Sequence, residues 1–148
     1  MTNTTKLNPN LFTGTPESYF AVLNNAPADE FPIDAIDCAV GRAVATVALV
    51  HIGLTVNTRV HDLVITDALW GVQSQLDLIQ KLADHYNVGS IVEAARAASS
   101  TLDLIMMSMG NGAFPSDGVI SSTLDCALMA IGKIKTLANQ EYELQKAA

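Results

Sequence analysis

The sequence predicts an all-α protein, a four-helix bundle of two sequence-related αα-hairpins with an irregular N-terminal arm. Three observations lead to this fold class. Four segments carry apolar residues at spacings of three and four, the period of one helix face. The second pair of segments matches the first pair when the chain is shifted by 55 residues. Aromatic residues are only 5% of the chain, so the core must consist of small and branched aliphatic side chains, which suit closely spaced helices.

Length and composition favour one small domain that buries much of its surface. The chain has 148 residues, of which 49% are hydrophobic and 16% are charged, against about 25% charged in ordinary domains. Its eight Lys and Arg and 15 Asp and Glu give a net charge of −7. Disorder throughout the chain is excluded. A surface with so few charges is typical of an oligomer, which hides area that a monomer would have to solvate.

Cysteine usage and the N-terminus predict a cytoplasmic protein. Cys38 and Cys126 lie far apart within apolar helical patterns, which indicates reduced, buried thiols instead of a disulfide framework. The first ten residues hold one basic residue, Lys6, and no apolar run, so no signal peptide begins there.

Residues 1–32 are expected to form the arm. Pro and Gly interrupt this segment repeatedly, at Pro9, Gly14, Pro16, Pro27 and Pro32. Within it, Thr15-Pro16-Glu17 has the form of a helix start and precedes the apolar residues 19–23, so a short helix is possible. An extended segment is the alternative.

Residues 33–148 are expected to form the bundle, with hairpins over 33–86 and 90–146. The first helix, 33–54, is apolar almost all round. Its charge-free stretch from Ala43 to Val56 is about 14 residues long, and roughly 20 are needed to cross a bilayer, so a buried helix is expected and membrane insertion is not.

The remaining three helices are predicted from their apolar stripes and end signals. They cover about 62–86, 90–109 and 117–146. Gly110-Asn111-Gly112 is typical of a left-handed helix stop, and Ser116 is placed to cap the last helix.

An internal duplication is indicated by the 55-residue shift. Twelve position pairs from Ile36 to Ala83 are identical at this offset, among them Ile36 with Ile91, Leu69 with Leu124 and Ile79 with Ile134. Two Ala- and Leu-rich hairpins share some residues at any best offset, so chance similarity is the alternative. Small residues on the first and third helices are further expected to let those two backbones approach closely: Ala39, Gly41, Ala43, Ala45, Ala94, Ala95, Ala97 and Ala98.

The sequence contains no readable catalytic, metal or cofactor motif. His51, His61 and His85 show no paired ligand spacing with each other or with the cysteines, and no Glu-x-x-His occurs. Ser and Thr on the helices have no adjacent base. Gly110-x-Gly112 lacks the glycine spacing of a phosphate loop, and eight basic residues without interleaved aromatics do not form a nucleic-acid footprint. We therefore expect neither an enzyme nor a cofactor or metal, and no nucleic-acid partner.

Candidate interaction residues lie around a methionine-rich segment and the single tryptophan. Met106, Met107 and Met109 cannot share one helix face, so at least one of them should lie on the surface and not in the core. On a surface, the adaptable methionine side chain is suited to binding apolar partners. Trp70 lies beside the stripe residue Leu69 and could anchor a partner. The predicted protein-interaction residues are Trp70, Met106, Met107, Met109 and Phe114. Gap filling in the core is the alternative for the methionines.

The segment Tyr19-Phe-Ala-Val-Leu, then Ala35-Ile-Asp-Cys-Ala and Leu69-Trp-Gly-Val followed by Gln75-Leu-Asp-Leu-Ile, resembles a class of short uncharacterised bacterial proteins. These proteins have a short apolar N-terminal segment and one helical hairpin. The resemblance covers about Tyr19 to Tyr86, implies a helical fold and carries no functional residues.

Two functions from different classes fit these observations. The first is a non-catalytic protein–protein interaction module that forms a homodimer or higher oligomer, a regulator or inhibitor of bacterial or phage origin. The alternative is a carrier that holds a small apolar ligand between the hairpins.

Overall fold

The computed structural model describes residues 31–56, 62–111 and 115–148, and these residues form four α-helices. The helices are α2 (Ile33–Thr55), α3 (Asp62–His85), α4 (Gly89–Gly110) and α5 (Asp117–Ala147). The all-α four-helix bundle expected from the sequence is confirmed, and each helix bound agrees with its prediction to within one residue. Of the arm expected over residues 1–32, residues 1–30 lie outside the described residues, as do His61 and Phe114. Phe31 at its end is a buried core residue.

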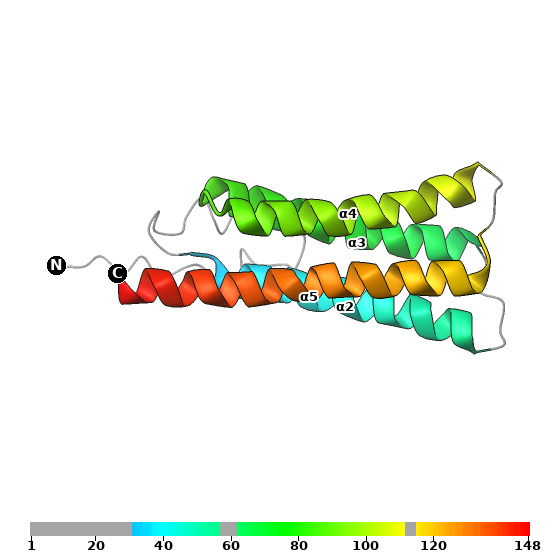
Figure 1. Ribbon diagram of the computed structural model, residues 1–148, viewed down its shortest axis with the longest axis horizontal. Coiled ribbons are helices and arrows are strands. Elements are labelled where there is room, and N and C mark those ends of the chain that lie inside the picture. The colour runs from blue at the N-terminus through cyan, green and yellow to red at the C-terminus, as the bar shows by residue number, and fades with distance from the viewer. Residues whose placement is uncertain (1–30, 57–61, 112–114) are drawn as a thin grey trace, which may run out of the picture.

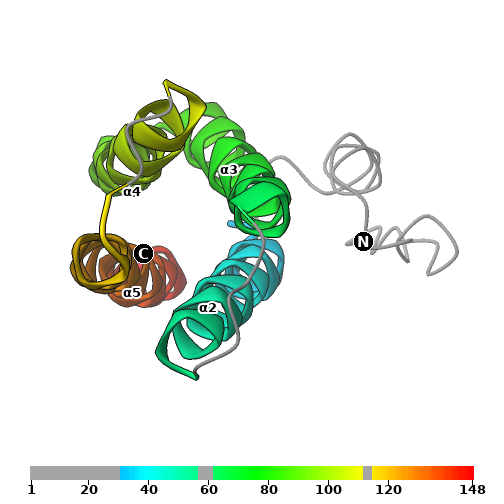
Figure 2. The same cartoon turned by 90° about the vertical axis from the view of Figure 1, so that its right-hand side faces the viewer.

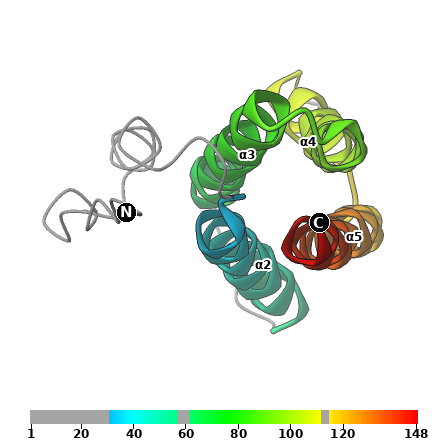
Figure 3. The same cartoon turned by 90° about the vertical axis from the view of Figure 1, so that its left-hand side faces the viewer.

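The helices form a ring in chain order, in which each helix packs on its two neighbours and α5 returns to α2 (Figures 2 and 3). The C-terminal ends of α2 and α4 and the N-terminal ends of α3 and α5 lie at one end of the bundle, on the right in Figure 1, which we call the loop end. The α3–α4 turn and the C-terminus lie at the opposite end.

This ring corrects one expectation. Helices α2 and α4 lie diagonally across the bundle, so their small residues do not form a close α2–α4 crossing (Figure 2). Ala39 and Ala43 are fully buried, but they face a bundle interior whose adjacent walls are α3 and α5. Gly41 and Ala45 are exposed and take no part in core packing.

The core is the aliphatic stripe of all four helices. Its largest fully buried side chains are Ile36, Ile65, Leu69, Leu76, Leu78, Ile79, Leu82, Ile91, Leu102, Leu124 and Ile131. Neither hairpin could shield this stripe by itself, so the two hairpins must pack together to remove it from water.

Positions 55 residues apart occupy matching places in the two hairpins. The core pairs are Ile36 and Ile91, Ala43 and Ala98, Leu69 and Leu124, Leu76 and Ile131, and Ile79 and Ile134, and all ten side chains have no exposed surface. The duplication itself stays a prediction from the sequence. The 55-residue shift that it uses is also the shift that superposes core positions of one hairpin on core positions of the other.

Local signals explain the helix ends. The Ser116 hydroxyl accepts a hydrogen bond from the Val119 amide at 3.4 Å, so the predicted cap of α5 is present. Asn87, with φ of 58°, closes α3: its amide donates to Asp84 O and the next amide, of Val88, donates to Ala83 O, the two bonds of a Schellman motif. At the end of α4, Asn111 is the C-cap, with φ of −88°, and its amide donates to Met107 O, which continues the helical ladder. The left-handed stop expected over Gly110-Asn111-Gly112 stays a prediction, because Gly112 lies outside the described residues.

Helix α2 is long and apolar enough to cross a membrane, because the whole helix is apolar on average despite its charged residues. The expectation from the sequence considered only the charge-free stretch, which is too short. Core helices of soluble proteins meet the same criterion. In the bundle, 33% of the apolar stretch of α2 is buried, on the side that packs against α3 and α5.

Candidate interaction surface

Exposed apolar side chains gather at the loop end of the bundle. Eight large apolar residues there are more than half exposed, and all lie within about two turns of the α2–α3 or α4–α5 connection. This loop-end surface consists of Leu49, Ile52, Val56, Leu63, Val64, Leu104, Met107 and Val119. The other strongly exposed apolar residues of the described chain, Trp70, Met129 and Leu144, lie farther along α3 and α5.

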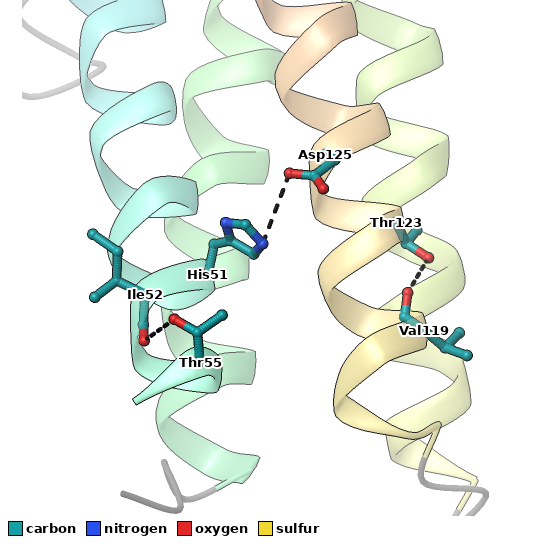
Figure 4. A network of polar contacts seen from close by, with 6 residues as sticks. All are labelled: His51, Ile52, Thr55, Val119, Thr123 and Asp125. Atoms are coloured by element: carbon teal, nitrogen blue, oxygen red, sulfur yellow. Dashed lines mark hydrogen bonds and ion pairs between the residues drawn. The ribbon is translucent and has the colours of Figure 1, made fainter. Parts of the chain in front are cut away.

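Helix geometry places these residues outside the core. On α2 the buried residues Ala43, Val47 and Val50 follow the inward stripe, whereas Leu49 and Ile52 fall between them on the outer side. In Figure 4 the side chains of Ile52 and Val119 point away from the seam between α2 and α5. Their exposure therefore follows from the register of the core and not from a distorted helix.

The loop-end surface occurs once on each hairpin. Leu49 is 70% exposed and its counterpart 55 residues on, Leu104, is 65% exposed. Val64 and Val119 form a second such pair, at 58% and 55%. Each hairpin thus presents a similar exposed apolar area at the same end of the bundle.

Polar side chains hold the helices together beside this surface. The amide of Gln73 on α3 donates to Ser99 O at 2.9 Å and to Asp103 Oδ1 at 2.7 Å on α4, and the Ser99 hydroxyl donates back to Gln73 Oε1. Across the α2–α5 seam, His51 Nε2 lies 3.8 Å from Asp125 Oδ1 (Figure 4). Both contacts are partly exposed and join adjacent helices.

An open groove of about 690 Å³ lies between α4 and α5 near the loop end. Small side chains line it: Thr101, Ser116, Gly118, Val119, Ser122, Thr123 and Cys126. Leu104 continues the same side of α4 one turn beyond Thr101, so an exposed apolar side chain flanks the groove.

The predicted interaction residues separate into three groups. Trp70 and Met107 are exposed, at 61% and 64%, and Met107 belongs to the loop-end surface. Met106 is half-buried against the core, and Met109 is 6% exposed, so Met109 fills the core and offers no free surface. Phe114 lies outside the described residues.

Sequence analysis missed most of the loop-end surface, including Leu49, Leu104 and Val119. The available signal was the set of apolar residues between stripe positions, at the ends of the helices that flank both hairpin connections. In a chain with 49% hydrophobic residues these positions look like parts of a wide stripe until the packing is known.

The described residues contain no group of three His, Cys, Asp or Glu side chains that could hold a metal ion. His85 packs its ring on Tyr86 with centroids 5.1 Å apart, and His51 faces the single carboxylate of Asp125. Both cysteines are free thiols, as expected, but Cys126 is exposed and not buried. It lies two residues after the core residue Leu124, a step that carries it to the outer side of α5.

Comparison of the chain with protein-family models, curated proteins and solved structures finds no match. The surface must therefore be interpreted from its own geometry and chemistry.

Proposed function

We propose that the protein is a non-catalytic interaction module that binds another protein through its loop-end surface. The observation that carries this proposal is the concentration of eight exposed apolar side chains at one end of the bundle. Scattered single apolar residues are normal on a protein surface, so their concentration at one end of the bundle is the feature that supports a binding role.

The core supports this role by making the loop end a rigid platform. Leu102 on α4 and Leu124 on α5 are fully buried, so the helices that carry the exposed Leu104 and Val119 are themselves anchored in the core. A partner would bury apolar area without paying for extensive ordering of these helices. We propose that such a module is a cytoplasmic regulator or inhibitor of bacterial or phage origin.

Capture experiments with matched variants test the proposal. Wild-type protein, the double variant Leu104→Gln/Met107→Gln and the control Met129→Gln/Leu144→Gln are immobilised and exposed to extract of the source cells. All four substituted side chains are more than 60% exposed, and the controls lie away from the loop end.

We expect mass spectrometry to find a protein that wild type and the control retain and that Leu104→Gln/Met107→Gln loses by about tenfold or more, because two central apolar contacts are removed. Circular dichroism shows whether each variant keeps its helix content. Identical retention by all three proteins would contradict a binding role for the loop end.

The surface hollows between helices do not favour the alternative function, a carrier of an apolar ligand, as far as the described residues line them. Two of them are surface grooves formed by α4 and α5 alone, and neither has walls from both hairpins. We therefore propose the interaction module only.

A further inference from the structure

Trp70 lies on the outer side of the seam between α3 and α4, next to the methionines of α4. The amide of Gln73 on α3 donates to Asp103 Oδ1 on α4 at 2.7 Å, which fixes the register of these two antiparallel helices (Figure 1). One turn from Gln73 toward the loop end is Trp70, and side chains three residues apart are neighbours on a helix. The same step along α4 leads from Asp103 to Met106 and Met107. The indole and both thioethers therefore lie at about the same level of the bundle.

Carboxylates lie on two sides of the Trp70 indole, which is 61% exposed. On α3, Asp67 is exposed and precedes Trp70 by three residues, a spacing that places Cβ atoms about 5–6 Å apart. On α4, Asp103 is held by Gln73, the neighbour of Trp70 one turn away. The face of an indole attracts cations through its ring quadrupole, and nearby carboxylates add to this attraction. The site is therefore suited to a cation.

The described chain does not fill this site with a basic side chain of its own. Its described residues include a cation–ring contact between Lys146 and Tyr142, and none that involves Trp70. Asp67 likewise has no ion-pair partner among them. The half of the bundle next to the loop end has no Lys or Arg in its described ranges, which are 43–56, 62–80, 97–111 and 115–132. The described chain thus leaves the site free for a cation of a partner.

We propose that this site binds an arginine of a partner protein, presented by a helix with apolar side chains beside it. The guanidinium stacks on Trp70 between Asp67 and Asp103, and an apolar side chain one turn along the partner helix packs on the exposed Met107. Arginine suits the site better than lysine because its planar group stacks on an aromatic ring and is more weakly hydrated. This inference rests on the proposed function, since Met107 belongs to the loop-end surface, and it adds the chemistry of the partner.

Charge argues against two other occupants of this site. A second copy that met it with its own loop end would bring carboxylates, and no Lys or Arg of the described ranges, toward Asp67 and Asp103, and like charges oppose association. An anionic lipid surface would be repelled in the same way. A helix that carries arginine instead gains attraction from both carboxylates and from the indole.

Defined peptides test this chemistry on the full-length protein. The probe is a fluorescein-labelled amphipathic Leu/Arg peptide of about 18 residues without aromatic side chains, long enough to form a helix. A peptide in which citrulline replaces every arginine keeps the shape of the side chain and removes its charge. A Leu/Glu peptide of the same apolar pattern is the second control. Fluorescence anisotropy measures each affinity.

We expect the Leu/Arg peptide to bind about tenfold more tightly than either control at about 0.05 M salt, and this advantage to shrink at about 0.5 M salt as the charges are screened. Equal affinities of the Leu/Arg and citrulline peptides would overturn the inference, because the charge of the guanidinium would then contribute nothing.

Substitutions at Trp70 separate the effect of the aromatic ring from that of apolar area. Trp70→Leu keeps an apolar side chain and removes the ring, so it should weaken Leu/Arg binding by about threefold or more, whereas Trp70→Phe should have a smaller effect. Circular dichroism shows whether each variant keeps its helix content. Wild-type affinity in Trp70→Leu would exclude the indole from the site and overturn the inference.

The carboxylates are tested by a matched pair of double variants. Asp67→Asn/Asp103→Asn removes both charges but keeps an acceptor oxygen for Gln73, and it should weaken Leu/Arg binding by about threefold or more. The control Asp84→Asn/Glu143→Gln removes two exposed carboxylates from the opposite half of the bundle and should change binding by less than about twofold. Equal losses in the two variants would show that only the net charge of the protein matters, and would contradict a local site.

The emission of Trp70 reports where the unlabelled Leu/Arg peptide binds, because Trp70 is the single tryptophan of the chain. Saturating peptide should shift the emission to shorter wavelength, since a helix that covers the exposed indole removes water from it. Unchanged emission during tight binding would place the peptide elsewhere and overturn the site.

Flotation of the protein with phosphatidylcholine vesicles, accompanied by the same emission shift, would also overturn the inference, because the site would then serve a lipid. An emission shift that depends on protein concentration without peptide would overturn it in favour of a second copy. In each case, capture of a cellular protein that is lost in Leu104→Gln/Met107→Gln would leave the proposed function standing, so the two failures are distinguishable.

Discussion

Two glutamines on α3 differ in whether their side-chain amides are hydrogen-bonded. Gln73 satisfies both ends of its amide across the α3–α4 seam, with Ser99 and Asp103. Gln75, two residues on, has a buried Oε1 without a hydrogen-bond partner among the described residues. A buried polar atom left unpaired costs free energy, whereas a paired one returns its desolvation cost.

Gln73→Met should therefore lower the free energy of unfolding by about 1 kcal/mol, because it strands the hydroxyl of Ser99 and removes two donors. Gln75→Met has the same change of shape and should be neutral or stabilising by up to about 1 kcal/mol. Urea unfolding followed by circular dichroism measures both. Equal losses in the two variants would contradict the assigned roles.

Asn87 offers a second test at this scale, since its φ of 58° is in the left-handed region. Asn87→Gly should keep or slightly raise stability, because glycine adopts this conformation without steric cost. Asn87→Val should lower the free energy of unfolding by about 1–2 kcal/mol, because a β-branched side chain clashes there. The midpoint of thermal unfolding gives the comparison, and a harmless valine would show that the turn is not left-handed in solution.

At the scale of elements, each helix carries three kinds of position that the apolar pattern alone does not separate. Ala43 is fully buried, Ala45 is exposed, and Leu49 is exposed although it is large and apolar. The ring order of the helices decides among them, because α2 is covered by α3 and α5 and left open on its outer side.

Ala43→Leu, or Ala98→Leu at the matching place on α4, should destabilise the bundle by about 1–3 kcal/mol through overpacking. The control Ala45→Leu adds the same atoms on the exposed side of α2 and should change stability by less than about 0.5 kcal/mol. Denaturant titration of the three variants separates these outcomes. A large loss from Ala45→Leu would mean that another surface covers α2 in solution.

For the whole molecule, the core contains side chains from both hairpins, so we expect the two hairpins to unfold together in one cooperative transition. Ile131 of the second hairpin and Leu76 of the first are both fully buried in the same core. Trp70, the single tryptophan, lies on the first hairpin and reports on it selectively.

Ile131→Ala should lower the free energy of unfolding by about 2–5 kcal/mol and shift the Trp70 fluorescence transition together with the circular dichroism transition. The exposed-site control Met129→Ala should leave both transitions near the wild-type values. Separate transitions for the two probes would show that the hairpins unfold independently.

Low charge density and the exposed loop end predict self-association of the isolated protein at high micromolar concentration, weak at low salt and stronger when salt screens the carboxylates. Sedimentation equilibrium at two salt concentrations measures it. Leu104→Gln/Met107→Gln should remain monomeric under both conditions, and a strictly monomeric wild type would contradict the homo-oligomer predicted from the sequence.

The sequence by itself determined the four helices and the residues that form the inward stripe, because periodicity and end signals are local properties. Leu76 and Ile131, for example, are core residues both by the apolar pattern of the sequence and by their burial in the structure. The tertiary structure alone decided which helices are neighbours, and with that the diagonal placement of α2 and α4, the burial of Met109 and the exposure of Cys126.

The candidate surface belongs to this second category. Apolar residues such as Leu49 and Leu104 are indistinguishable from core residues by chemistry, and only the positions of the adjacent helices determine whether water or protein covers them. The physical reason is that burial depends on which surfaces face one another, a relation between segments far apart in the chain that no single helical pattern encodes.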